Sequence, residues 1–455
     1  MKITIVGCGK IGTAIMKSLL KEHHDIIVID SNEEIVSSII NKYDVIGICG
    51  NATSYDLLRQ ANTDKCDLFI AMTGSDEYNM LSSFIAKKMG AKHTIARIRD
   101  SKYSTPDFDF IKNHLGISMT INPEYMTAQV LYNILKLPSA INVETFSSGG
   151  FELIELNVKK DQKIIGVPLF EVRKSLPINF LICAVQRGEE VFIPNGLSVL
   201  QEGDKIGIIV SYDDAHKLLK LIGTEQILIK DVMIVGASKI AYYLTKFLLS
   251  GKNSVTVIEK DKTACEKFVE HIGGGVNVVY GNGLNKDLLL ESGLSNSDAF
   301  VALTGKDADN VLMSVSALDK QSLKVITKIN SEELIANAEK MGVECIVSAK
   351  NVVEDAVNRY VKALKDTIGS KIETLYSLMN GTIEAIEFLV TSDFKYAGVP
   401  LKDLTFKSNA IIAGIIRNSE NIIPNGEDVI LANDKVIIIT SNNKVLELSE
   451  IIRKK

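Results

Sequence analysis

The chain carries the same series of short motifs twice, at an almost constant separation. An apolar run entering a glycine turn at 6–12 returns at 235–241, and the spacing between matching positions drifts only from 229 (236 − 7) to 232 (398 − 166). Repeats of roughly 20–50 residues build solenoids, so a period of about half the chain predicts a two-domain module used twice. The other matched pairs are Asp30 and Glu259, Gly50-Asn51 and Gly281-Asn282, Thr73-Gly74 and Thr304-Gly305, 166–169 and 398–401, and 193–196 and 423–426.

Composition narrows the classes of protein that such a module can serve. The 455 residues carry a net charge of −5, which gives no general attraction to nucleic acid or acidic lipid. The longest apolar stretches, such as 178–185, are far shorter than the roughly 20 residues of a membrane span. A strand pattern starts at residue 2 without a charged leader, so we expect a cytoplasmic chain. The six cysteines lie far apart and are expected to be buried, reduced thiols.

The first part of each half alternates short β patterns with helical ones. In the first half, apolar runs at 2–7, 26–29, 45–49, 68–72 and 94–98 are separated by helical patterns at 13–22, 33–42, 54–61 and 79–89. The second half repeats the strands at 232–235, 255–258, 276–280, 299–303 and 324–329. Such alternation indicates a parallel sheet with helices on both faces, and hence a doubly wound Rossmann domain in each half.

The glycine turn of the first copy stands in the context that a dinucleotide site requires. It follows a strand and opens a helix, and Asp30 lies 23 residues after Gly7 (30 − 7), at the end of the second strand. Gly7 allows the tight turn, Gly9 lets the backbone approach a pyrophosphate, and Gly12 permits close helix packing. Asp30 can accept hydrogen bonds from a ribose and would repel a 2′-phosphate, which favours NAD(H), ATP or ADP over NADP.

The second copy departs from this fingerprint. Gly236 and Glu259 are kept, but Ser238 replaces the second glycine and Ala241 replaces the third. The Ser238 side chain would stand where a pyrophosphate passes closest, although its hydroxyl can also hydrogen-bond a phosphate. The sequence leaves open whether this second site binds a nucleotide.

A connecting helix and a small domain complete each half. Apolar stripes at 123–137 and 351–364 predict helices that pack on their own Rossmann sheet, with packing on a neighbouring domain as the alternative. The segments 140–225 and 371–455 combine short β runs with one helix, and so predict small α+β domains. We therefore expect an α/β chain of four domains: Rossmann 1 at 1–138, small domain 1 at 139–226, Rossmann 2 at 227–366 and small domain 2 at 367–455.

Together, these residues resemble the TrkA family, the regulatory subunits of bacterial Trk potassium-uptake systems. The matching segments are 7–12, 28–30, 50–51, 73–77 with Asn79-Met80, and 96–99, within a tandem of Rossmann (KTN or RCK-N) and small (RCK-C) domains that covers essentially the whole chain. The resemblance implies a cytosolic homo-oligomer, a tetramer, which binds NAD(H) or adenine nucleotides. It also implies docking beneath a membrane potassium-translocating subunit of the TrkH or TrkG type.

The resemblance also assigns site residues, copy by copy. In the first copy the phosphates would lie on the glycine turn, the ribose on the strand-two acid, the adenine beside 51–53, and Arg97 would reach a phosphate. The full set there is Gly7, Cys8, Gly9, Lys10, Ile11, Gly12, Asp30, Asn51, Ala52, Thr53, Thr73, Gly74 and Arg97. The second copy offers Gly236, Ser238, Lys239, Ile240, Glu259 and Thr304, but Lys328 replaces the arginine. NAD(H) is expected in the first domain, with ATP, ADP or AMP as alternatives in either.

Nothing in the sequence predicts catalysis. A hydride-transfer enzyme needs a proton donor or acceptor near the nicotinamide, yet the six histidines are scattered, and His23 and His24 are expected on the surface. No cluster has metal-ligand spacing. The predicted function is nucleotide-dependent regulation of potassium uptake through a population shift. The alternatives are an NAD-dependent oxidoreductase, a regulator of a cation/proton antiporter, or a purely structural ring. Asp30 and Glu259 argue against the structural ring, because fold stability alone is expected to need no acid at these positions.

Overall fold

The computed structural model describes residues 1–100, 103, 106–146, 150–224, 228–319, 323–364, 369–379, 381–441 and 445–453. The chain divides into two compact units. Residues 1–128 and 348–358 form the first unit, and residues 129–347 and 359–455 form the second. Two expected domain boundaries, after residues 226 and 366, fall outside the described residues.

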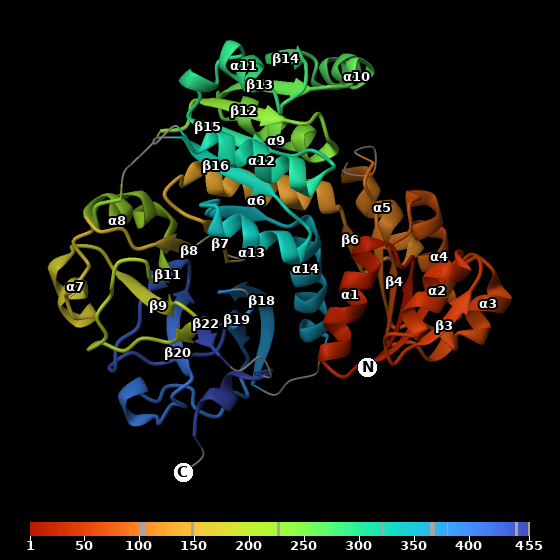
Figure 1. Cartoon of the computed structure of the whole chain (residues 1–455). Coiled ribbons are helices and arrows are strands. Elements are labelled where there is room, and N and C mark those ends of the chain that lie inside the picture. Colours follow the sequence, from red (N-terminus) through yellow and green to blue (C-terminus); the bar gives the residue numbers. More distant parts are fainter. Residues whose placement is uncertain are drawn as a thin grey trace. The chain divides into compact units, whose positions relative to one another are not determined.

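The first unit is built on a six-stranded parallel sheet with the order β3-β2-β1-β4-β5-β6 (Figure 1). Its strands are β1 (Lys2–Val6), β2 (Asp25–Asp30), β3 (Ile46–Cys49), β4 (Leu68–Ala71), β5 (His93–Arg97) and β6 (Met119–Ile121). Its helices are α1 (Lys10–Lys21), α2 (Glu33–Ile40), α3 (Tyr55–Gln60), α4 (Asp76–Met89) and α5 (Pro106–Leu115). The central strands are apolar runs buried on both faces, as a sheet covered by helices requires. The prediction of a doubly wound sheet is confirmed.

The second unit contains a second sheet of the same order, β14-β13-β12-β15-β16-β17. Its strands are β12 (Asp231–Val235), β13 (Ser254–Glu259), β14 (Val276–Tyr280), β15 (Ala299–Ala302), β16 (Lys324–Lys328) and β17 (Cys345–Val347). Its helices are α9 (Lys239–Ser250), α10 (Lys262–Ile272), α11 (Lys286–Glu291), α12 (Asp307–Ala317) and α13 (Glu332–Lys340). The motifs that recur in the sequence therefore belong to two domains with the same sheet topology.

The two small domains of the second unit share one hydrophobic core. Their antiparallel sheets have the orders β10-β9-β11-β8-β7 and β18-β19-β22-β20-β21. The shared core contains Phe146 and Phe151 from the first sheet and Leu378 and Ile437 from the second. The strands are β7 (Asn142–Thr145), β8 (Phe151–Asn157), β9 (Phe180–Arg187), β10 (Glu190–Phe192), β11 (Lys205–Ser211), β18 (Ser370–Leu378), β19 (Ile383–Val390), β20 (Ala410–Arg417), β21 (Glu420–Ile422) and β22 (Lys435–Thr440).

The expectation of one helix in each small domain is wrong. The first domain has two, α7 (Leu169–Ser175) and α8 (Ala215–Leu221). Among its described residues the second domain has only 3₁₀ turns, at Leu401–Asp403 and Leu448–Ile451. The repeated Pro-Leu segment starts α7 in the first domain and the 3₁₀ turn at Leu401–Asp403 in the second. In both places the proline fixes φ, near −56° at Pro168 and −57° at Pro400.

The connecting helices do not pack only on their own sheets, which corrects the expectation drawn from their apolar stripes. The helix α6 (Pro123–Lys136) leaves the first unit at Ala128, and its Tyr132 ring contacts Phe247 of α9 in the second unit. The helix α14 (Ala349–Ala363) begins within the first unit beside α1 (Figure 1), where Asn358 donates a hydrogen bond to Ser18 Oγ at 2.7 Å. Each helix therefore packs partly against elements of the other half of the chain.

Two expectations from composition can be compared with the structure. Five of the six cysteines are buried, but Cys49 is exposed, because β3 is an edge strand. Within the described part of the chain, no helix combines the length and the apolar character needed to cross a bilayer.

Candidate functional site

The glycine turn of the first copy lies where the sheet order reverses. β1 pairs with β2 on one side and β4 on the other, so the loops that follow β1 and β4 open a crevice at their carboxyl ends. Gly7 has φ of +84°, and a Cβ there would lie 2.7 Å from the backbone nitrogen of Thr73. A Cβ on Gly12 would lie 2.0 Å from the Gly7 carbonyl oxygen, whereas one on Gly9 would meet no atom within 4 Å. Gly7 and Gly12 are thus needed for the turn itself, and Gly9 faces open space.

Helix α1 starts at Lys10 without a side-chain cap. Its N-cap residue is Gly9, which has no side chain to accept from the first N–H groups. A helix N-terminus of this kind combines unpaired N–H donors with a partial positive charge, which suits a phosphate. Lys10 is exposed, and neither it nor Cys8, Ile11 or Gly12 is on the cavity wall described below. Cys8 is buried, and its backbone N–H donates a hydrogen bond to Asp30.

Asp30 links the end of β2 to the glycine turn. Its Oδ2 accepts a hydrogen bond from the Cys8 N–H at 2.7 Å, and its Oδ1 accepts from the Asn32 N–H at 2.9 Å. Glu259 makes the matching bond with the Ala237 N–H at 2.8 Å in the second copy. The acid therefore does support the local fold in both copies, and the argument that stability alone needs no acid there is wrong.

A cavity of about 610 Å³ opens beside this turn, within the usual size range of small-molecule sites. The Asn51 Oδ1 accepts from both the backbone N–H and the hydroxyl of Thr53, each at 2.9 Å, which fixes the loop after β3. The predicted site residues on its wall are Gly7, Gly9, Asp30, Asn51, Ala52, Thr53, Thr73, Gly74 and Arg97. Tyr78 and Ser82 of α4 also line it, and neither was among the predicted site residues.

Arg97 brings a cationic group to the same wall. Its Nη2 lies 3.3 Å from the Glu124 carboxylate, and its Nε is buried without a hydrogen-bond partner in the described structure. Burial lowers the pKa of the Arg97 guanidinium, and the Glu124 carboxylate opposes that shift. An unpartnered N–H donor beside a helix N-terminus fits a phosphate oxygen.

Two polar residues of α4 hold the loops of the site, and neither was among the predicted site residues. Asn79 accepts from the Thr73 N–H at 2.8 Å and donates to the Arg97 carbonyl at 2.9 Å, so it ties the ends of β4 and β5 together. Asp76 accepts from the N–H groups of Arg99 and Asp100, each at 2.8 Å. Both residues return in the second copy, as Asn310 and Asp307, with equivalent bonds. Their recurrence in the two halves is the signal that could have identified them.

The second copy forms a smaller cavity of about 310 Å³. Met313 lines it at the position that Ser82 holds in the first copy, and a longer side chain there leaves less space. Ser238 Oγ accepts from the Ala241 N–H at 3.3 Å, so α9 carries the cap that α1 lacks. Lys328 Nζ donates to the Thr304 carbonyl at 2.6 Å. Gly236, Ser238, Glu259 and Thr304 line this cavity, whereas Lys239 and Ile240 do not.

The Cys8 thiol next to the first site is held in an unreactive state, and His24 lies away from that site, at the amino-terminal edge of the sheet. Burial, reinforced by Asp30, raises the pKa of the Cys8 thiol to about 12, so little thiolate forms at neutral pH. His24 is only 7% exposed, contrary to expectation, because it lies against the N-terminal amine at 3.3 Å. In the described part of the chain, no group of three or more His, Cys, Asp or Glu side chains is arranged to hold a metal ion.

Comparison with known proteins gives the same domain pattern. The family model for the TrkA-N domain matches residues 3–123 and 232–349, and that for the TrkA-C domain matches residues 153–223 and 385–453. The chain is 32% identical to the Trk system potassium uptake protein TrkA homolog of Archaeoglobus fulgidus and 27% identical to the Trk system potassium uptake protein TrkA homolog 2 of Methanosarcina mazei. Each match covers 100% of this chain and 100% of the relative.

A solved structure shares this fold. It is the GsuK channel bound to NAD, with a TM-score of 0.64 at 15% identity over 96% of this chain and 76% of that one. Two Rossmann domains, two small domains, the glycine turn with Asp30, and full-length sequence similarity all agree. The chain therefore belongs to the TrkA family of Trk potassium-uptake proteins.

Proposed function

We propose that this chain is the nucleotide-binding regulatory subunit of a Trk-type potassium uptake system, and that it responds to NAD(H) bound in the first Rossmann domain. The adenosine ribose would bind Asp30, the pyrophosphate would lie over Gly9 at the start of α1, and Arg97 would contact a phosphate. Bound there, the dinucleotide would supply negative charge to the uncapped helix N-terminus and a hydrogen-bond acceptor to the Arg97 Nε. ATP or ADP is the alternative occupant of this cavity.

The difference between the two helix starts carries this proposal. The α1 N-terminus has no side-chain cap and faces a cavity of about 610 Å³, whereas Ser238 caps α9 beside a cavity of about 310 Å³. A helix that satisfies its own N–H groups has less to gain from a phosphate. We therefore assign the nucleotide to the first copy and a mainly structural role to the second.

The remaining features of the proposal follow from similarity to the TrkA relatives, which are named for potassium uptake. The membrane partner is a potassium-translocating subunit of the TrkH or TrkG type, and the chain acts at the cytoplasmic face of the membrane as a homotetramer. The four domains have boundaries after residues 138, 226 and 366. Nucleotide binding favours one assembly geometry, and the partner responds to that geometry.

Calorimetry of the full chain with NADH and with ATP tests the site. A matched pair of variants exchanges the α4 residue between copies: S82M fills the first cavity, and M313S enlarges the second. We expect S82M to weaken binding at least tenfold and M313S to leave the first-site affinity unchanged. Equal loss in both variants, or none in either, would refute the assignment to the first copy.

Cell-level assays separate this function from the alternatives. Co-expression with a potassium-translocating membrane subunit should give rubidium uptake that depends on the chain and falls in S82M. Steady oxidation of NADH by any small substrate would instead identify an oxidoreductase. Cation/proton exchange in place of uptake would identify an antiporter regulator.

A further inference from the structure

The small domains show how this chain builds a structural pair between an arginine and a carboxylate. Arg187 donates to both oxygens of Asp204, from Nε at 2.8 Å and from Nη2 at 2.7 Å. Arg417 and Asp434 repeat this arrangement in the second copy, at 2.9 Å and 2.7 Å. Two parallel bonds make such a pair strong and geometrically specific. Its recurrence in both halves is what a pair that supports the fold requires.

The pair between Arg97 and Glu124 is built differently. The Arg97 Nη2 donates to the Glu124 Oε1 at 3.3 Å. In the described part of the chain, the Arg97 Nε and the Glu124 Oε2 are both buried without a hydrogen-bond partner. Each unsatisfied buried atom carries a desolvation cost that a second bond would have offset. A better acceptor can therefore replace Glu124 at this guanidinium.

The second copy has a different pair of residues at these two positions. Lys328 stands in the place of Arg97, and its Nζ donates to the Thr304 carbonyl. Lys350 is the second residue of α14, as Glu124 is the second residue of α6. Two lysines cannot form an ion pair with each other. The arginine and the acid are thus both present beside the uncapped helix start and both replaced beside the capped one, which associates them with the nucleotide and not with the Rossmann fold itself.

A phosphate in the first cavity would compete with Glu124 for the guanidinium. Arg97 lines that cavity, but its Nε is buried, so the guanidinium has to turn before Nε meets a phosphate oxygen. Asn79 donates to the Arg97 carbonyl at 2.9 Å, which fixes the backbone and confines the motion to the side chain. A phosphate offers two oxygens to the guanidinium, whereas Glu124 engages one of its nitrogens.

Glu124 also connects this contact to a helix that runs beyond the first Rossmann domain. It lies in the first turn of α6, where the partial positive charge of a helix N-terminus favours an acid. The first unit ends at Ala128 within this helix, and Tyr132, one turn later, contacts Phe247 of α9. A change at Glu124 therefore acts on the helix that leads into the second unit.

We propose that Glu124 is a positioning residue that holds Arg97 back from the nucleotide, and that a bound phosphate takes Arg97 over and releases the start of α6. This inference rests on the proposed binding of NAD(H) in the first copy, and it adds the route by which occupancy of that site reaches the connecting helix. Glu124 lowers the nucleotide affinity through Arg97 and couples binding to α6.

A double-mutant cycle tests the competition. Calorimetry of the full chain measures the NADH affinity of the wild type, E124Q, R97Q and the double variant. E124Q removes the charge that holds the guanidinium, so NADH should bind about three- to tenfold more tightly than to the wild type. R97Q should bind NADH more weakly, and the gain from E124Q should be smaller in the R97Q background, because Glu124 acts through Arg97.

Hydrogen exchange of peptides from α6 gives a second readout that affinity alone does not provide. The Met126 N–H, which donates to the Asn122 carbonyl at 3.0 Å, reports on the first turn. Exchange there should become faster when NADH binds to the wild type. E124Q should show the faster exchange without NADH and little further change with it. The matched control K350Q alters the same helix position in the second copy, and it should leave the NADH affinity unchanged.

The contrary outcomes separate this inference from the proposed function. It is overturned if the wild type binds NADH and E124Q binds it no more tightly, or if NADH does not speed exchange at the start of α6. A gain from E124Q that is as large in the R97Q background would show direct repulsion of the phosphate, and would also overturn it. If the wild type binds neither NADH nor ATP, the proposed function fails, and this inference fails with it.

Discussion

Replacing Glu152 with glutamine should stabilise the protein, and the gain should grow with pH. Burial raises the pKa of Glu152 from its ordinary value of 4.5 to about 7, and Lys136 opposes part of that rise. Because the folded-state pKa lies above the unfolded one, the folded chain holds a proton that the unfolded chain releases. The native state therefore loses stability as the pH rises from about 4.5 to beyond 7.

The size of the effect follows from the same two values. The interval from 4.5 to about 7 corresponds to roughly 3 kcal/mol, at about 1.4 kcal/mol per pH unit. Glu152 is only 5% exposed, so solvent screens little of this penalty. E152Q avoids the penalty because glutamine does not ionise. Its advantage over the wild type should be small at pH 4.5 and near its full value at pH 8.

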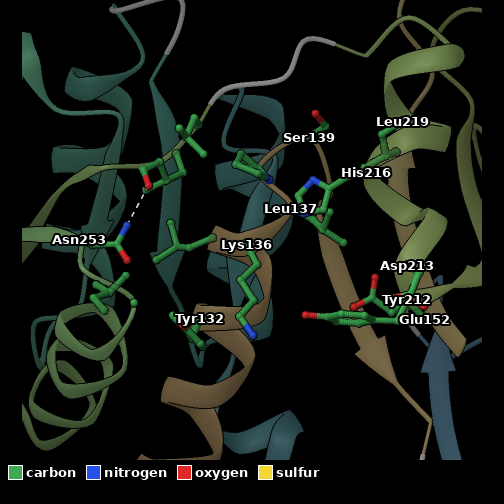
Figure 2. A pocket seen from close by; sticks show the side chains of 16 residues that line it. Tyr132, Lys136, Leu137, Ser139, Glu152, Tyr212, Asp213, His216, Leu219 and Asn253 are labelled. Atoms are coloured by element: carbon green, nitrogen blue, oxygen red, sulfur yellow. Dashed lines mark hydrogen bonds between the residues drawn. The ribbon is translucent and has the colours of Figure 1, made fainter. Parts of the chain in front are cut away.

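Differential scanning calorimetry of the ligand-free full chain at pH 5, 6, 7 and 8 measures this trend. Glu152 lines a cavity of about 770 Å³ (Figure 2). The other charged and titratable groups on its wall are Lys136, Asp213, His216, Tyr132 and Tyr212, and E152Q leaves them in place. Taking the difference between variant and wild type at each pH cancels their titration to first order. We expect the melting temperature of E152Q to exceed that of the wild type by several degrees at pH 8.

The matched variant in the other copy should behave in the opposite way. Glu384 is the second residue of β19, as Glu152 is the second residue of β8. E384Q breaks the buried ion pair between Lys362 and Glu384, which costs about 3–5 kcal/mol. Its melting temperature should fall below that of the wild type at every pH tested. The reasoning is refuted if E152Q and E384Q shift the melting temperature in the same direction, or if the E152Q difference does not grow between pH 5 and 8.

Three further predictions concern the nucleotide site. G9A should keep the wild-type melting temperature, because the added methyl group meets no protein atom, and it should lose NADH affinity, because the methyl group occupies space proposed for the pyrophosphate. G7A should melt at a lower temperature than the wild type, because φ is +84° at this position. Calorimetry measures the melting temperature and the NADH affinity of both variants. D30A should lower the free energy of unfolding by about 1–3 kcal/mol, since the N–H group of Cys8 loses the acceptor that it contacts at 2.7 Å. Denaturant melts measure this change, and an unchanged free energy of unfolding would contradict the prediction. Iodoacetamide at pH 8 should label the exposed Cys49 and spare Cys8, whose pKa is about 12; peptide mass spectrometry that found Cys8 labelled first would contradict its burial.

Much of this architecture was predictable because it depends on local pattern. Short apolar runs alternating with helical stripes specify a parallel sheet, and the motifs that recur after 229–232 residues specify that the sheet occurs twice. The glycine turn could also be predicted from the sequence, since the backbone geometry of the turn requires Gly7 and Gly12. The roles of Cys8 and Lys10 could not, because position in a motif does not say whether a side chain faces the cavity or the core.

Other features depend on which distant segments meet. The expectation for the connecting helices was wrong because an apolar stripe records that a face is buried and not what covers it. Met313 lines the smaller second cavity where Ser82 lines the first, and only the fold brings Met313 to Glu259 and Thr304. Sequence spacing placed the acid Asp30 correctly, but its bond to the turn appeared only with the structure.

The sequence by itself determined the duplication, the Rossmann topology of each half and the stronger nucleotide fingerprint of the first copy. Each of these depends on the identity and spacing of short motifs along the chain. The tertiary structure decided which copy has the larger cavity, which helix start is capped, and which of two equivalent buried carboxylates, Glu152 or Glu384, has a partner. Those outcomes depend on desolvation and on contacts between residues far apart in sequence, and no local pattern records them.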